Sequence, residues 1–553
     1  MANEIELKLA IAPADLARLR GHPLVERHAE GEWAAQTLAN RYFDTPGRDL
    51  ARSRAALRLR LAGEQWWQTL KTSPASVSGL SARGEWEVPV AGAALDFDAF
   101  TDLPDEVRAL LDRLAPRLGP VFDTDFERES RTLRLKGGTR FELALDRGEL
   151  RAGKGKTLRR EPICEVELEL IEGDPRRVLD FAERLAADIA LIPETRSKAA
   201  RGFALADRRP AVAAKVALPE ADPAAHAGAL LAAVVTRCQQ ALLLDTALIR
   251  AGATTPAAGR IAPTGDGTKP PASEGGSAAP SASVTDDAED PAELVHQARV
   301  ALRRLRVALR HARPLLPRRE AELRAPLREL GRRLGRTRDL DVLTGQTLPR
   351  LDGKIGAPST AARDDAYSDA DLRAALDARL AADRAQALDE LREALASPAF
   401  ARTMLQLEGL ALRLAAKRGA AADRLARREL KAARDAARST VAALDGDDAE
   451  ARHQFRIAVK RYRYALDMYG ALFDADAVQA QRKALSHLQD VLGEMNDDAV
   501  AIARLDLLPS SPHAADLARA ARDAIAAAQP EAARLARELL ALPAPWKKPA
   551  ARS

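Results

Sequence analysis

Apolar and polar residues alternate in short segments through the first 205 residues. Turn signals such as TPG (45–47) and KGG (136–138) separate several of these segments. Because alternate side chains of a strand share a face, the pattern predicts about eight short strands in a closed or nearly closed barrel. The predicted strands are residues 4–9, 40–45, 56–61, 66–71, 84–90, 131–135, 139–146 and 164–170.

Helical periodicity appears in two stretches of this region, 105–118 and 175–189, which could cover the aliphatic strand faces. From residue 223 to residue 541 the strand patterns nearly vanish, and Ala, Leu and Arg recur at helical spacing. The sequence therefore predicts two domains of different class: a β-barrel at 1–205 and an all-α domain at 223–541.

The remaining segments are expected to lie outside both cores. Residues 206–222 are predicted to be the linker, and 542–553 the C-terminal tail. Residues 252–288 are dominated by Gly, Pro, Ser, Thr and Ala, so they bury too little to offset their ordering entropy. Because a helix matching the second domain precedes them, at 229–249, they are predicted to be a disordered insertion within that domain.

Charged side chains share faces on the predicted strands. Glu4, Glu6 and Lys8 share one face of the first strand, and Arg58 and Arg60 share one face of the third. A solvated polar face explains one such strand, and it remains an open explanation for the 84–90 strand. Adjacent carboxylates repel each other unless cations lie among them. The recurrence of this pattern therefore predicts a charged lumen.

A lumen with a carboxylate wall and a guanidinium wall suits phosphate chemistry. Mg²⁺ and Mn²⁺ prefer hard oxygen ligands, while Arg and Lys bind phosphoryl oxygens. Phosphoryl transfer depends mainly on positioning and on neutralising charge. The predicted lumen holds both kinds of group.

The ordered motifs of residues 1–205 resemble the CYTH, or triphosphate tunnel metalloenzyme, family. The motifs are ExExK at the start, YFDT, LRLR, TLK, RGEWE, ELALDRGEL, EVELEL and SKAARGF (197–203). The resemblance implies an eight-stranded antiparallel tunnel that binds a linear triphosphate and a divalent metal. Family members hydrolyse inorganic triphosphate, thiamine triphosphate or RNA 5′-triphosphates, and some cyclise ATP.

The same resemblance assigns roles to individual residues. It implies Mg²⁺ or Mn²⁺ as the cofactor, with metal ligands at Glu4, Glu6, Glu165, Glu167 and Glu169. It implies substrate-binding cations at Lys8, Arg58, Arg60, Lys71, Arg128 and Lys198. The catalytic set that it implies is Glu4, Glu6, Lys8 and Asp146.

A basic helical face occurs twice in the second domain. In the first copy, Arg299, Arg303, Arg306 and Arg310 follow His296 at offsets of 3, 7, 10 and 14 residues, on one side of a helix. The second copy lies 157 residues later and comprises His453, Arg456, Lys460 and Arg463. LGRTRDLDVL (334–343) and LGEMNDDAVA (492–501) repeat as well. The sequence therefore predicts a duplicated helical bundle whose basic faces could meet in one groove.

These twin repeats resemble the CHAD family, which binds inorganic polyphosphate. The resemblance implies a binding set of His296, Arg299, Arg303, Arg306, His453, Arg456, Lys460 and Arg463. Arg310 is a weaker candidate because Asp467 stands at the matching position. Nucleic acid is the rival ligand, but aromatic residues make up only 4% of the chain and do not interleave with the basic stripes. No specific nucleic-acid partner is therefore expected.

Composition adds the expected location. The chain has two cysteines, Cys164 and Cys238, which favours a reducing compartment. Charges near the start argue against a signal peptide, and the most apolar stretch, 227–235, is too short to span a bilayer. The expected location is the cytoplasm, with polyphosphate granules as a further candidate and no membrane partner.

Together, these features predict a metal-dependent hydrolase of inorganic triphosphate with a helical domain that binds long-chain polyphosphate. Two alternatives stay open. The protein could be a non-catalytic polyphosphate scaffold, or a CYTH enzyme that acts on thiamine triphosphate or ATP.

Overall fold

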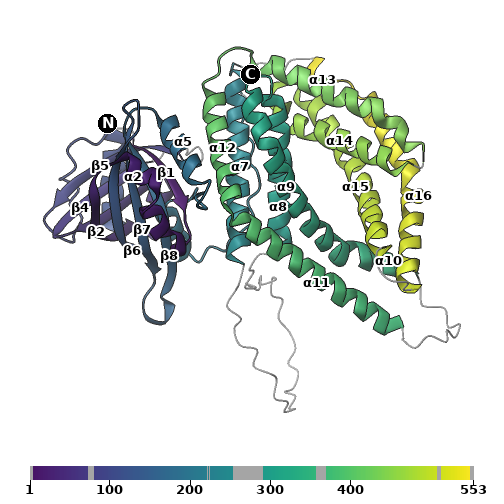
Figure 1. Ribbon diagram of the computed structural model, residues 1–553. Coiled ribbons are helices and arrows are strands. Elements are labelled where there is room, and N and C mark those ends of the chain that lie inside the picture. Colours follow the sequence, from purple (N-terminus) through teal and green to yellow (C-terminus); the bar gives the residue numbers. More distant parts are fainter. Residues whose placement is uncertain are drawn as a thin grey trace, which may run out of the picture.

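The computed structural model describes residues 4–72, 80–220, 222, 224–252, 291–355, 369–446, 448–506 and 512–547. The insertion predicted at 252–288 lies, except for Gly252, outside the described residues, as does the side chain of Glu4. Two domains stand side by side: a barrel and a helical domain (Figure 1).

A closed antiparallel sheet forms the first domain, as predicted. Its order is β5-β4-β3-β2-β6-β7-β8-β1-β9, and an additional pairing of β1 with β5 closes it. The eight predicted strands are present, and a two-residue ninth strand extends the sheet. The strands are β1 (Glu4–Ala10), β2 (Ala29–Asp44), β3 (Ala55–Ala62), β4 (Gln65–Thr72), β5 (Leu80–Val90), β6 (Gly119–Arg134), β7 (Arg140–Ala152), β8 (Arg159–Glu172) and β9 (Ile192–Pro193).

The aliphatic strand faces point outward into layers covered by helices. Helix α5 (Pro175–Leu185) begins at the N-cap Asp174, and Phe181 on its buried face packs against Phe141 of β7 with ring centroids 5.2 Å apart. Helix α4 (Asp105–Leu114) buries Leu111 and Leu114 in a second cluster with residues of β3 and β4. Each such Leu or Phe contributes about 1.5–3 kcal/mol. This outward packing leaves the barrel interior to the polar faces.

Among the described residues, four further helices belong to the first domain and ten helices belong to the second. The former are α1 (Leu16–Arg20), α2 (Pro23–His28), α3 (Asp49–Arg52) and α6 (Lys198–Ala206). The latter are α7 (Ala227–Ala251), α8 (Pro291–Ala312), α9 (Pro317–Val342), α10 (Leu348–Ile355), α11 (Asp369–Leu395), α12 (Pro398–Ala415), α13 (Ala422–Thr440), α14 (Ala449–Tyr469), α15 (Ala475–Leu505) and α16 (Pro512–Ala541).

The helical domain has the predicted duplicated arrangement. Helices α8 and α9 carry the first copy of the two repeated motifs, and α14 and α15 carry the second. Helices α12 and α7 lie next to the barrel, α8 and α9 lie beyond them, and α13 to α16 form the far half (Figure 1). Among the described helices, α7 alone is long and apolar enough to cross a membrane, but 72% of its most apolar window is buried inside the domain. Its apolar character is therefore that of a core helix.

Two segments predicted to lie outside the cores are packed. In the interdomain segment, the Ala214 amide donates to Asp245 Oδ1 at 2.6 Å, and Arg304 donates to the Val216 carbonyl at 3.2 Å. In the predicted tail, Trp546 lies edge-on to the Tyr462 ring. Residues 542–547 therefore pack on the helical domain, while 548–553 lie outside the described residues.

The two domains meet at α5 and α12. Gln406 on α12 donates to Glu183 on α5 at 2.9 Å, and Arg413 donates to Asp180 at 3.0 Å. Gly409 of α12 faces Leu179 of α5, and a Cβ atom at Gly409 would lie 3.4 Å from Leu179 Cδ2, at van der Waals distance. Buried residues of the two domains belong to one continuous hydrophobic cluster.

Candidate active site and anion groove

The barrel encloses a polar cavity of about 570 Å³. Its charged lining matches the predicted lumen, with cations and carboxylates interleaved. The cations are Lys8, Arg54, Arg58, Arg60, Lys71, Arg128, Lys198 and Arg209, and the carboxylates are Glu6, Glu85, Glu87, Glu167 and Glu169.

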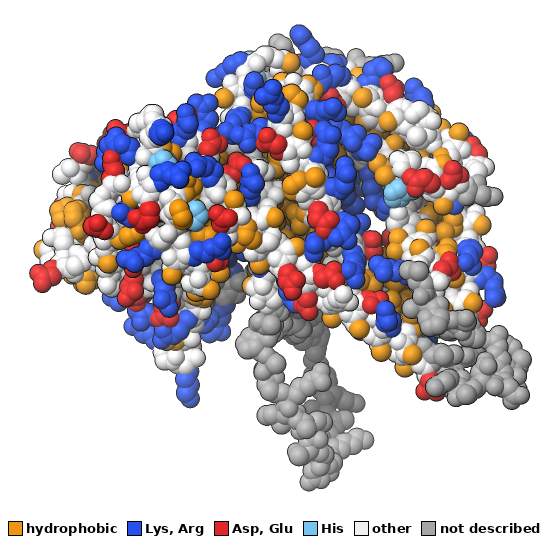
Figure 2. Space-filling model, viewed as in Figure 1, with side chains coloured by type: hydrophobic (Ala, Val, Ile, Leu, Met, Phe, Trp, Pro, Cys, Tyr) orange, Lys and Arg blue, Asp and Glu red, His pale blue; other side chains and the backbone are white. Residues whose placement is uncertain are grey.

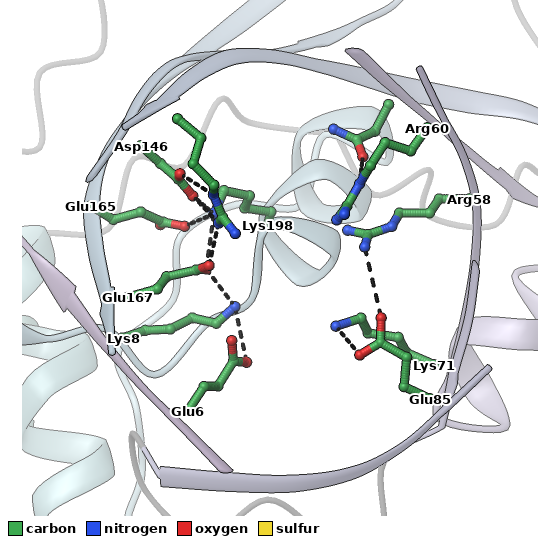
Figure 3. Close-up of polar contacts among 12 residues, drawn as sticks. Glu6, Lys8, Arg58, Arg60, Lys71, Glu85, Asp146, Glu165, Glu167 and Lys198 are labelled. Atoms are coloured by element: carbon green, nitrogen blue, oxygen red, sulfur yellow. Dashed lines mark hydrogen bonds and ion pairs between the residues drawn. The ribbon is translucent and has the colours of Figure 1, made fainter. Parts of the chain in front are cut away.

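One wall of the cavity is acidic. Asp146 of β7 stands opposite Glu165 of β8 in the sheet register, and Glu167 follows two residues later on the same face. All three carboxylates are buried, and one oxygen from each lies within 4.8 Å of the others. Figure 3 shows them along one side of the barrel, pointing inward. Such a cluster must be neutralised to persist in the interior.

Four cations neutralise this acidic wall, and one of them, the buried Arg201, places Nη1 3.2 Å from Glu165 Oε2. Lys198, at the start of α6, places Nζ 2.7 Å from Asp146 Oδ2 and 3.0 Å from Glu167 Oε1, and it also pairs with Glu165. Lys8 Nζ lies 2.9 Å from Glu167 Oε1 and 3.1 Å from a Glu6 oxygen. Arg128 donates to both oxygens of Asp146 at 2.7 Å. The acidic wall is thus a network of alternating charges. Its members come from several strands and a helix, so the pattern of one strand does not show it.

The network fixes the protonation states. Burial alone would raise the pKa of Glu167, but Lys198, Lys8 and Arg128 outweigh it and hold that pKa well below its usual range. Burial would lower the pKa of Lys198, yet Glu167 and Glu165 raise it above the ordinary lysine value. Glu167 is therefore ionised and Lys198 is charged at neutral pH.

The opposite wall is basic and less tightly paired. Arg58 Nη2 lies 3.7 Å from Glu87 and 3.9 Å from Glu85, while Lys71 lies 2.7 Å from Glu85. Burial, and then the neighbouring Arg58, lower the pKa of Arg60 to about 10. Figure 3 shows this wall facing the acidic one across the lumen. An anionic ligand between the walls would relieve the crowding of cations on the basic side.

The acidic wall fits a divalent metal. Asp146, Glu165 and Glu167 offer clustered carboxylate oxygens, the donor type that Mg²⁺ and Mn²⁺ prefer. Glu6 and Glu169 also line the cavity and could add oxygen ligands.

A second cavity, of about 580 Å³, lies in the helical domain between α8, α9 and α14. We call it the basic groove. Figure 2 shows Lys and Arg side chains gathered around the hollow between the two halves of this domain. Apolar side chains such as Leu327 and Ile457 also line the groove, and Glu320 is its one acidic lining residue. The cations that line it are Arg303, Arg306, Arg310, Arg313, Arg324, Arg328, Lys460 and Arg461.

Some cations of the basic groove are poorly neutralised, although Arg324 pairs with Glu320 at 2.6 Å. Burial, followed by Arg456, Arg303 and Arg299, lowers the pKa of Lys460 to about 6. Arg456 Nε is buried without a hydrogen-bond partner among the described residues. Arg299 is satisfied, since it donates to Asp339 Oδ1 and the Gly335 carbonyl at 2.9 Å each. Crowded, unpaired cations of this kind are the expected signature of an anion site.

Comparisons with known proteins assign both domains to families. The profile of the CYTH domain matches residues 2–203, and that of the CHAD domain matches residues 278–506. The chain is a CYTH domain followed by a CHAD domain.

Individual relatives cover parts of the chain. An inorganic triphosphatase from Haemophilus influenzae is 31% identical over 216 residues, which are 38% of this chain and 56% of that protein. The chain thus spans about half the length of this curated relative.

Two solved structures are also similar. The CHAD domain from the plant Ricinus communis is 26% identical, with 60% of this chain and 98% of that one covered and a TM-score of 0.46. A protein from Hippeastrum, described as revealing a dominant triphosphatase activity, is 22% identical, with 36% and 95% covered and a TM-score of 0.28. Both TM-scores are too low to carry a functional argument.

The CYTH lumen contains most of the residues predicted for it. The predicted substrate cations line it together with Glu6, Glu167 and Glu169, and Asp146 and Glu165 join them through the ion pairs of Lys198. The position of the Glu4 side chain lies outside the described residues. Asp146, predicted as a catalytic group, lies in the densest carboxylate cluster, with Glu165 and Glu167 rather than with Glu6.

The CHAD groove contains only part of the predicted set. Arg303, Arg306 and Lys460 line it, while Arg299 and Arg456 influence Lys460 from beside it. The other predicted residues, His296, His453 and Arg463, do not line the groove. Of these, Arg463 donates to Gln489 at 2.9 Å.

Several site residues were missed or left open by the sequence reasoning. Glu85 stands opposite Lys71 in the sheet register, and Glu87 accepts a hydrogen bond from Thr69 at 2.7 Å, so both belong to the tunnel. In the groove, Arg324 and Arg328 come from α9, which carries no histidine repeat. Their four-residue spacing on one helix was the available signal.

Proposed function

We propose that this protein is a metal-dependent hydrolase of inorganic triphosphate whose CHAD domain binds inorganic polyphosphate. The observation that carries the first half is the CYTH lumen, in which a wall of clustered carboxylates faces a wall rich in cations. The named activity of the 31% identical relative supports the choice of substrate. The two free cysteines, Cys164 and Cys238, support the proposed cytoplasmic location.

The chain's own residues would bind and orient the substrate. Arg58, Arg60 and Lys71 present donors to phosphoryl oxygens from the basic wall, and Arg128 and Lys198 do so from the acidic side. A divalent cation held by the acidic wall would neutralise phosphate charge and lower the pKa of a water molecule. The electrostatic environment is already arranged before the substrate arrives, so little reorganisation is needed.

The reaction we propose is hydrolysis of one terminal phosphoanhydride. The oxygen of water forms a bond to the terminal phosphorus, and the bridging phosphorus–oxygen bond breaks. The two hydrogens of that water end on the products, orthophosphate and diphosphate. The cations of the basic wall would hold the departing diphosphate and stabilise the charge that develops on it.

A substrate panel tests this activity. Phosphate release from triphosphate, thiamine triphosphate and ATP is measured with full-length protein at fixed Mg²⁺ or Mn²⁺. We expect triphosphate to give the highest kcat/KM. Faster turnover of thiamine triphosphate or ATP would identify that compound as the substrate instead. Tight binding of triphosphate without phosphate release would show that the protein is a non-catalytic scaffold.

The poorly neutralised cations of the basic groove carry the second half of the proposal. A linear polyanion would pair with Arg303, Arg306 and Lys460 without needing base-stacking residues. Binding of long-chain polyphosphate to full-length protein, and its loss in Arg303→Ala/Lys460→Ala, would test this. Unchanged binding in that variant would refute a role for the groove.

A further inference from the structure

The two outermost cations of the CYTH cavity, Arg54 and Arg209, do not come from strands. Arg54 directly precedes β3, and Arg209 belongs to the interdomain segment after α6. Both are exposed, unlike the cations deeper in the lumen. We call this pair the outer rim.

Arg54 extends a row of cations that the barrel already contains. Arg54, Ala56, Arg58 and Arg60 occupy every second position, and all four line the cavity. Lys71 stands opposite Ala56 in the register, so it fills the gap between Arg54 and Arg58. The extended chain from Ala55 to Arg60 spans about 17 Å, or about 13 Å along a barrel axis after strand tilt, and Arg54 lies beyond its end. Three phosphates in a row are much shorter than that.

Arg209 is fixed at the rim although it belongs to the connecting segment. Its amide donates to the Ala204 carbonyl at 3.1 Å, and its guanidinium pairs with Asp207 at 2.9 Å. Asp207 also pairs with Arg48 at 2.7 Å, which ties the segment to the barrel. The first residues after α6 therefore form part of the cavity wall rather than a free tether.

The backbone at the rim is unusual. Among the described residues, three that are not glycine have φ in the left-handed region, and all are arginines next to the rim: Arg48, Arg54 and Arg208, at 60°, 56° and 52°. Side chains other than Gly, Asn or Asp rarely adopt this conformation, and it tends to cluster at binding sites. The Arg54 guanidinium has no ion pair or hydrogen bond with any described residue, so its charge is available to an anion.

We propose that Arg54 and Arg209 form a subsite for the phosphates of a linear chain beyond those held by Arg58, Arg60 and Lys71. The tunnel would then accept inorganic polyphosphates longer than triphosphate, with the terminal phosphate at the acidic wall and the rest of the chain leaving along the outer rim. This inference rests on the proposed function of the same cavity, and it names the substrate class more closely.

The test compares chain lengths in Arg54→Ala/Arg209→Ala and wild-type full-length protein. Phosphate release is measured with inorganic triphosphate and with linear tetra- and pentaphosphate at fixed metal. We expect the double substitution to raise KM for the longer chains roughly tenfold more than KM for triphosphate. Arg41→Ala is the matched control, because Arg41 is exposed on the same barrel, pairs with Asp123 and does not line the cavity.

The experiment is repeated in an Arg303→Ala background, because the basic groove could otherwise deliver longer chains. A selective effect that persists there supports the rim. The proposed subsite is overturned if the double substitution affects all substrates equally or has no effect. It is also overturned if the wild type cleaves triphosphate but not longer chains. If the wild type cleaves none of them, the proposed function fails, and calorimetric binding of tri- and pentaphosphate to the same variants still decides the subsite.

Discussion

Lys198 Nζ lies 2.7 Å from Asp146 Oδ2, although the side chains are only 8% and 0% exposed. A lysine from a helix thus occupies the centre of the carboxylate cluster that would hold a metal. Any cation that enters must share these oxygens with Lys198 or displace it, because all three carboxylates contact its ammonium. The carboxylates of the acidic wall are therefore paired before any metal binds, and an entering metal would compete with Lys198 for their oxygens.

Neutralising Glu167 should abolish catalysis. Glu167 contacts Lys8, Arg128 and Lys198, so Glu167→Gln removes one metal ligand and leaves three cations with fewer partners. We expect kcat for triphosphate to fall by about 100-fold or more. Phosphate release at saturating Mg²⁺ or Mn²⁺ is the measurement.

Glu149→Gln is the control for that substitution, because Glu149 is a partly exposed carboxylate that pairs with Arg160 outside the lumen. Its activity should match wild type. Equal activity of Glu167→Gln and wild type would show that the acidic wall is not the reaction centre.

Removing a groove arginine should weaken polyphosphate binding in a salt-dependent way. Arg303 is partly buried in the basic groove, and burial lowers its pKa, so a bound polyanion would relieve an existing cost. We expect Arg303→Ala to weaken binding roughly tenfold and to reduce the slope of log K against log salt by about 1. Arg519→Ala, on the exposed face of α16, should change neither quantity.

Polyphosphate binding should strengthen as the pH falls from 8 toward 6. The pKa of Lys460 is about 6 in the free protein, so this lysine is largely neutral at pH 8. A bound polyanion favours the charged form and raises that pKa, so binding takes up a proton. Below about pH 6 the lysine is already charged, and the dependence should level off.

Calorimetry in buffers of different ionisation enthalpy would measure this proton uptake. Lys460→Met should bind less tightly and show a smaller uptake at pH 7. If wild type and Lys460→Met show the same uptake, Lys460 is not the group that titrates.

Acid should destabilise the helical domain through His311. The ring is 5% exposed and lies 2.8 Å from the Tyr469 hydroxyl, and burial, followed by Arg310 and Arg428, lowers its pKa to about 3. The unfolded chain takes up a proton near pH 6.5, whereas the folded chain does not. Stability should therefore fall by about 1.4 kcal/mol per pH unit between about 6.5 and 3 from this group alone.

Thermal melts of His311→Phe against wild type would isolate this contribution. The phenyl ring can keep the packing against Tyr469 but cannot titrate, so the difference in Tm between the two proteins should shrink or reverse as the pH falls. His487→Gln, at an exposed site on α15, should follow wild type at every pH. Parallel curves for His311→Phe and wild type would assign the acid sensitivity to other groups.

The sequence predicted the barrel because apolar and polar residues alternate strictly in the parts of its strands that line the lumen. It found only the ends of β2 and β6, whose other halves, near 29–39 and 119–130, carry few large apolar side chains. Which strands are neighbours could not be read from one chain. Glu85 was therefore left open, although its place opposite Lys71 decides its role.

For the basic groove as well, the sequence did not show which helices are neighbours. The histidine repeats gave the basic faces of α8 and α14, but helical periodicity does not say which third helix closes a cavity. Helix α9 supplied Arg324 and Arg328, and Arg461 entered from the side of α14. The segment 206–222 was predicted as a linker, yet partly buried hydrogen bonds at Ala214 and Val216 anchor it to the helical domain.

The interface between α5 and α12 has a consequence for attempts to isolate one domain of the protein. Leu179 of α5 lies against Gly409 of α12. Removal of the helical domain, by proteolysis or by truncating the gene after α6, would therefore expose the apolar face of α5 to water. The first domain expressed alone should aggregate or require detergent. On heating, the intact chain should unfold both domains in a single transition.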